Sequence, residues 1–64
     1  MQLVYDYIKA NGALIGEGAG KGDKLCLEII AAYRLHLTRP DDPGAATILE
    51  STIKEYRKRK NGTN

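Results

Sequence analysis

The clearest hydrophobic pattern in the chain lies over residues 24–38 and has the period of an α-helix. Asp23 precedes this segment and can act as an N-cap, because its carboxylate can accept hydrogen bonds from the first free backbone amides. Pro40 follows it and pushes the residue before it out of the helical region, which ends the helix. The spacing predicts a helix over 24–38 whose core-facing stripe consists of Cys26, Ile29, Ile30, Tyr33 and Leu37.

A second apolar stripe runs along the far side of the same predicted helix. Leu27, Ala31 and Leu35 are spaced four residues apart, among charged and polar neighbours. A helix that is apolar on two sides is either enclosed within the monomer or covered by a partner, since exposed apolar strips on small proteins mark interfaces. We therefore consider this stripe a candidate protein interface, which Ile48 from the next helix would extend.

Residues 43–60 are predicted to form a second long helix. Asp42 is a suitable N-cap, and Pro43 suits the first helical position, where the missing N–H costs nothing. Only a short turn, residues 39–42, separates this helix from the previous one, so the two are expected to be antiparallel neighbours. The apolar seam of the second helix consists of Ala46, Leu49, Ile53 and Tyr56.

The N-terminal segment, residues 2–11, allows two interpretations. As a helix it places Leu3, Val4, Tyr7 and Ile8 on one face. As a strand it would turn at Asn11-Gly12, a strong hairpin signal. We favour a short helix packed on the helical hairpin, because the returning segment is too rich in glycine for a strand. The choice between helix and hairpin stays open for residues 3–15.

Residues 13–22 contain glycines at alternate positions, which predicts a flexible linker. Lys21, directly after Gly20, raises the question of a phosphate-binding loop. The Walker pattern does not fit, because Ile15 stands where its first glycine belongs and Gly22 where its serine or threonine belongs. The dinucleotide pattern G-x-G-x-x-G does not fit either, because Lys21 and Asp23 stand where its third glycine would be needed.

The composition adds limits on the chemistry. With 64 residues, the chain is expected to be a single all-α domain with residues 61–64 as a frayed tail, and its small core makes self-association an expectation. Cys26 is the only cysteine and His36 the only histidine, which excludes an internal disulfide and leaves no set of metal ligands. No catalytic group of side chains is visible, so we expect no cofactor and no enzyme. No apolar run approaches a membrane span, so we expect a cytoplasmic protein without a membrane partner.

The net charge is +2, and its excess lies in the run Arg57–Lys60. In an antiparallel hairpin this run would come near the start of the helix over 24–38. The resulting basic pole could bind the phosphates of a nucleic acid or a small nucleotide. Cations at a helix C-terminus are also favourable for the helix alone. The candidate phosphate-binding residues are Lys21, Lys24, Arg57, Lys58 and Arg59, with Tyr5 or Tyr7 to stack on a base.

Two functions follow from these features. The first is a non-enzymatic interaction protein, a homo-oligomeric regulator or inhibitor of the kind that phages and mobile elements encode. It would act on itself or on another protein through the apolar surface of helix 24–38. The alternative is a phosphate binder that uses the basic pole.

Overall fold

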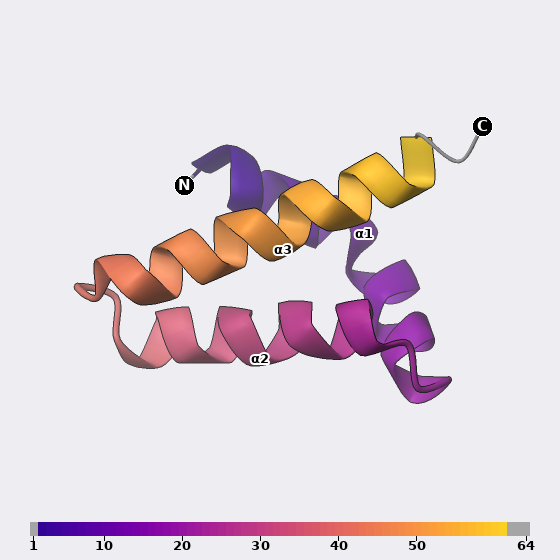
Figure 1. Cartoon of the computed structure of the whole chain (residues 1–64), viewed down its shortest axis with the longest axis horizontal. Coiled ribbons are helices and arrows are strands. Elements are labelled where there is room, and N and C mark those ends of the chain that lie inside the picture. Colours follow the sequence, from indigo (N-terminus) through magenta and orange to yellow (C-terminus); the bar gives the residue numbers. More distant parts are fainter. Residues whose placement is uncertain (1, 62–64) are drawn as a thin grey trace.

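The computed structural model describes residues 2–61, and these form three α-helices joined by short turns (Figure 1). The helices are α1 (Gln2–Gly20), α2 (Lys24–Thr38) and α3 (Pro43–Asn61). The all-α class is therefore confirmed for this part of the chain. Of the predicted tail 61–64, Asn61 is the last residue of α3, and residues 62–64 lie outside the described residues.

Helices α2 and α3 lie side by side and run in opposite directions (Figure 1). Both predicted N-caps are present. The Asp23 carboxylate accepts from the backbone N–H of Leu25 at 3.0 Å, and the Asp42 carboxylate accepts from that of Gly44 at 2.8 Å. These caps satisfy amides that have no partner within the helix, and so they set where α2 and α3 begin.

Helix α1 corrects two predictions, because the helix does not end at residue 11 and residues 13–20 are not a linker. It runs over 19 residues to Gly20, which also excludes the hairpin interpretation. Each glycine inside a helix costs about 1 kcal/mol relative to alanine, and packing offsets this cost. Ile15 is buried, with 3% of its surface exposed. Gly18 lies directly against the side chain of Cys26.

The chain leaves the helical conformation at Gly22, whose φ is +86°. There the N–H of Asp23 donates to the carbonyl of Gly18 at 2.9 Å, and that of Gly22 donates to the carbonyl of Ala19 at 3.0 Å. This pair of bonds is a Schellman motif, which needs a residue with positive φ after the helix. Gly22 is therefore the glycine that this turn requires.

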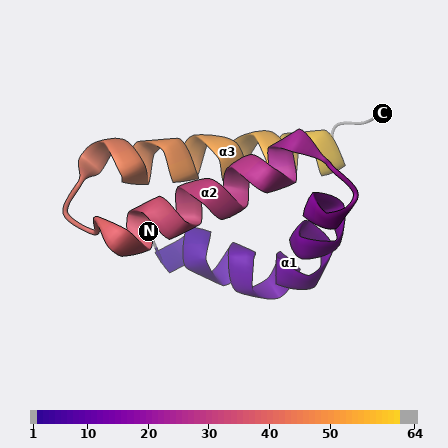
Figure 2. The same cartoon turned by 90° about the horizontal axis from the view of Figure 1, so that it is seen from below.

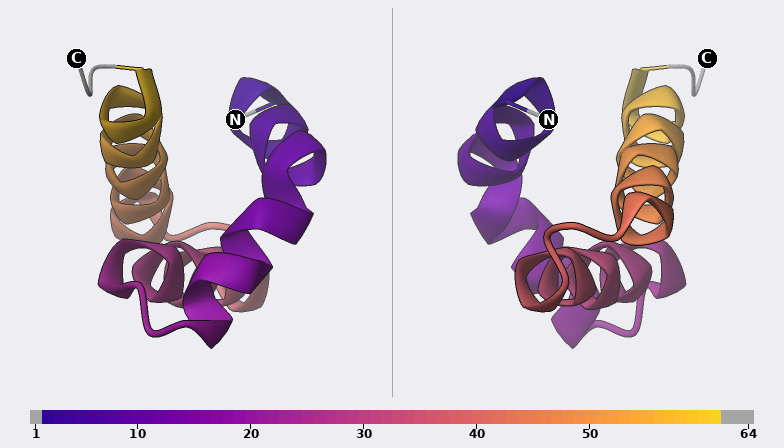
Figure 3. Two further views of the ribbon diagram at one scale, coloured as in Figure 1. Left: turned by 90° about the vertical axis from the view of Figure 1, so that its right-hand side faces the viewer. Right: turned by 90° about the vertical axis from the view of Figure 1, so that its left-hand side faces the viewer.

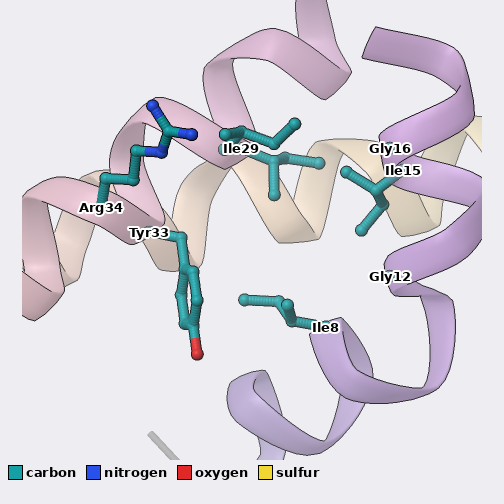
Figure 4. Close-up of a pocket in the computed structure, with 8 residues that line it drawn as sticks. Ile8, Gly12, Ile15, Gly16, Ile29, Tyr33 and Arg34 are labelled. Carbon is teal, nitrogen blue, oxygen red and sulfur yellow. The ribbon is translucent and has the colours of Figure 1, made fainter. Parts of the chain in front are cut away.

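The ribbon of α1 bends part-way along its length (Figures 2 and 4). The bend lies close to Gly12, and the side chain of Asn11 donates there to the backbone carbonyl of Tyr7 at 2.9 Å. Glycine and a side chain that bonds to the helix backbone are both usual causes of a bend. The bend allows α1 to follow α2 from its end back to its start, and α1 packs mainly on α2.

All three helices contribute to one core. Most of the predicted core stripe of α2 is at least half buried, but Leu37 is 57% exposed, which corrects its placement. It lies in the last turn of α2, next to the exposed 39–41 turn. Conversely, His36, which is not part of the predicted stripe, is buried. The buried core cluster consists of Ile15, Cys26, Ile29, Ala32, Leu49, Ile53 and Tyr56.

Candidate interaction surface

The second apolar stripe of α2, which we name the outer strip (Leu27, Ala31 and Leu35), is not covered by the other residues of the described range, 2–61. Leu27 is 47% and Leu35 is 39% exposed, and Ala31 is also exposed. Seen along the helix pair, α3 and the first half of α1 lie on one side of α2, and the second half of α1 passes the start of α2 (Figure 3). The outer strip is therefore available to a partner.

A shallow groove between α2 and α3 continues the outer strip. Ala31 and Leu35 form part of its α2 wall, and Ile48, which is 50% exposed, stands on its α3 wall. The groove encloses about 410 Å³. Thr52 also lines it, and its hydroxyl donates to the backbone carbonyl of Leu49 at 2.9 Å. The structure thus places Ile48 beside Ala31 and Leu35 of the outer strip.

Two charged residues that the sequence analysis did not select lie on the flanks of the outer strip. Glu28 lines the groove on the α3 side, and Arg34 lies on the α1 side. Both are exposed, and neither forms an ion pair within residues 2–61. Their positions three residues before and after Ala31 were visible in the sequence, but only the packing shows which neighbour each one faces.

Arg34 lies at the edge of an apolar cleft between α1 and α2 (Figure 4). The cleft encloses about 150 Å³. Gly12 and Gly16 are among the residues that line it, and a Cβ at either position would meet no atom within 4 Å. The other residues that line it are Ile8, Ile15, Ile29, Ile30 and Tyr33.

The predicted basic pole is partly assembled at the opposite end of the molecule from the turn between α2 and α3. An ion pair of 2.7 Å joins Arg59 to Asp23 and so brings the end of α3 to the start of α2. Lys21, Lys24 and Lys58 are exposed.

The aromatic residues proposed for this pole are held by other contacts. The Arg57 guanidinium lies 5.4 Å from the centre of the Tyr7 ring, and Tyr7 packs edge-on against Tyr56. Tyr5 is hydrogen-bonded through its hydroxyl to Nε2 of His36, near the end of α2. Tyr5 therefore lies away from the basic pole, whereas Tyr7 belongs to its structural support.

Asp23 also reduces the positive charge available at this pole. Its hydrogen bond from Arg59 lowers the pKa of the Asp23 carboxyl, and the backbone amides of Cys26 and Leu25 act in the same direction. The same contact raises the pKa of Arg59. Since Asp23 occupies the N-terminal amides of α2 and neutralises Arg59, an incoming anion would have to compete with a carboxylate already in place.

This ion pair predicts how stability depends on pH. The folded protein holds the Asp23 carboxyl at a lower pKa than the unfolded chain does. The pair therefore contributes stability above the unfolded-state pKa and loses it as the pH falls through the folded-state pKa. We expect the melting temperature to fall below about pH 4, and to fall less in Asp23→Asn, which keeps a cap acceptor without the charge.

Circular dichroism melts of both proteins between about pH 7 and pH 2 would measure this. Asp41→Asn is the matched control, because Asp41 is an exposed acid in the 39–42 turn without an ion pair among the described residues. An Asp23→Asn profile as steep as that of the unaltered protein would contradict the assignment.

The remaining reactive side chains are enclosed. Cys26 is buried, and burial raises the pKa of its thiol. His36 is 5% exposed, and its Nδ1 has no hydrogen-bond partner within residues 2–61. The described residues contain no group of three or more His, Cys, Asp or Glu side chains that could hold a metal ion. None of the helices in this part of the chain is both long and apolar enough to cross a membrane.

Comparisons with protein-family models, curated proteins and solved structures found no match for this chain.

Proposed function

We propose that the chain is a small non-enzymatic interaction protein that acts through the outer strip and the adjoining groove. The observation that supports this most strongly is the continuity of the exposed apolar surface. Ala31, Leu35 and Ile48 line one groove, and Leu27 lies one turn further along the same face of α2. Isolated exposed leucines are ordinary, but contiguous apolar surfaces of this kind mark contacts with other proteins.

The size of the chain favours self-association as the first use of this surface. A domain of 64 residues buries only about 60% of the surface that its unfolded chain exposes. A second, identical copy of the chain that bound to the outer strip would remove further apolar surface from water. We propose a homo-oligomeric regulator or inhibitor whose activity lies in this contact.

The basic pole is the weaker candidate. Arg59 is paired with Asp23, and Arg57 and Lys60 lie over the rings of Tyr7 and Tyr56. These contacts give the pole a structural role, so phosphate binding stays a prediction without an observation of its own.

The double variant Leu27→Asp with Leu35→Asp tests the proposal. Both side chains are exposed, so the monomer should keep its helical content. Each new carboxylate would have to lose water in the contact, and we expect the association constant to fall by at least about a hundredfold. Light scattering behind size exclusion measures the association, and circular dichroism the folding.

The matched control is Leu14→Asp, because Leu14 is 50% exposed on α1 and lies outside the outer strip and the groove. It should leave association unchanged. A folded double variant that associates as tightly as the unaltered chain would overturn the proposal.

A further inference from the structure

The outer strip has a local symmetry about Ala31 that points to the kind of partner it fits. Leu27 and Leu35 lie four residues before and after Ala31, about 6 Å away along the helix axis and about 40° to either side of it. Glu28 and Arg34 lie three residues before and after it, about 4.5 Å away and about 60° to either side. A rotation by about 180° around an axis that passes through Ala31, perpendicular to the helix axis, therefore exchanges the positions of the two leucines. The same rotation exchanges the positions of the two charged residues.

The residues around Glu28 and Arg34 agree with their positions on opposite sides of the outer strip. Glu28 lines the groove formed with α3, whereas Arg34 lies beside the cleft formed with α1. Since neither has an ion-pair partner among the described residues, both charges are available to another molecule. Any surface that presents a cation near Glu28 and an anion near Arg34 is complementary to this one.

A second copy of this chain presents such a surface. A two-fold axis between two copies makes each use the same patch, so a contact on one side is repeated on the other. Ala31 has a small side chain and allows two α2 helices to approach closely where they cross. Two such helices can cross at a steep angle with either of two hands. With one hand, Glu28 of each copy lies against Arg34 of the other. Leu27 then meets Leu27 of the second copy, and Leu35 meets Leu35.

The opposite sense of crossing is unfavourable. It places Glu28 against Glu28 and Arg34 against Arg34, and like charges across an interface repel. In the favoured arrangement Leu35 of the second copy lies at the mouth of the groove, on whose wall Ile48 stands. The apolar residues thus supply the contact, and the two charges select its geometry.

We propose that the outer strip binds a second copy of this chain across a two-fold axis at Ala31, with Glu28 of each copy paired to Arg34 of the other. This inference rests on the proposed function, and it adds the partner, the register and the residues that set specificity.

Charge reversal tests the pairing. Glu28→Arg alone and Arg34→Glu alone each place like charges together at two symmetry-related points, and we expect each to weaken self-association by about tenfold or more. An equimolar mixture of the two single variants should form a heterodimer, because both of its charge pairs are again opposite. The double variant Glu28→Arg with Arg34→Glu should return to the self-association of the unaltered chain.

Sedimentation equilibrium measures each association constant, and native mass spectrometry identifies the heterodimer in the mixture. Glu17→Arg, an equal charge change at an exposed site on α1, is the control and should not alter association. Circular dichroism confirms that each variant is folded.

The outcomes separate the pairing from the proposed function. Single reversals that associate like the unaltered chain, or a mixture that does not recover, would overturn the pairing. If Leu27→Asp with Leu35→Asp still abolishes association in that case, the proposed function stands alone. An unaltered chain that is monomeric at every concentration would overturn both.

Discussion

Replacing Leu49 with alanine is expected to lower the free energy of unfolding by about 3 kcal/mol or more. Leu49 is the most deeply buried leucine, at 0% exposed, and it lies in the core cluster with residues of all three helices. The change removes apolar contacts and leaves a cavity that the surrounding helices can close only in part. A chain of this length is expected to have a total stability of about 3–10 kcal/mol, so the variant should be close to unfolding.

Urea unfolding followed by circular dichroism measures this loss. Leu14→Ala is the control, because the same atoms are removed from a side chain that is 50% exposed, and alanine is the better helix former. We expect the control to change stability by less than about 0.5 kcal/mol. Equal losses in the two variants would show that α1, α2 and α3 do not share the core described above.

Replacing Gly18 with alanine is expected to destabilise the protein, whereas the same change at Gly16 should stabilise it. A Cβ at Gly18 would lie 2.6 Å from Sγ of the buried Cys26, so the Cys26 side chain or the two helices would have to shift, at a cost of about 1–3 kcal/mol. At Gly16 a Cβ meets no atom within 4 Å, and alanine should gain up to about 1 kcal/mol through helix propensity.

Adding Cys26→Ala provides the internal check, since it removes the sulfur atom that the new methyl group would meet. The pair Gly18→Ala and Cys26→Ala should therefore be less destabilising than the sum of the two single changes, a non-additivity that thermal and urea unfolding of the four proteins can measure. A Gly18→Ala protein as stable as Gly16→Ala would contradict the close approach of α1 to α2.

The packing of Gly18 of α1 against Cys26 of α2 explains why the later part of α1 could not be predicted from the sequence. The caps Asp23 and Asp42 and the helices that follow them depend on local chemistry, and they were predicted. The helical state of residues 13–20 depends instead on the packing of Ile15 and Gly18 against α2, which overrides the poor helix propensity of glycine. Gly22 ends α1, but the sequence shows four alternate glycines and does not distinguish the one with positive φ.

The apolar residues of the candidate surface could be predicted, because they recur with the period of an α-helix. The spacing of Leu27, Ala31 and Leu35 predicted a second apolar face, and the structure leaves it exposed. Glu28 and Arg34 could not be assigned, because their significance depends on which helix lies on each side of α2. Tyr5 and Tyr7 were both proposed for the basic pole because they are close in sequence to the glycine-rich segment. Residues two apart on a helix point in different directions, and Tyr5 instead contacts His36.

The mass of the unaltered chain in solution shows whether the outer strip joins two copies. Light scattering behind size exclusion, over a range of concentrations and at low and high salt, gives this mass without any variant. We expect twice the mass of a single chain at both salt concentrations, because the leucines of the outer strip supply the contact and the charges mainly orient it. A single-chain mass under all these conditions would contradict it.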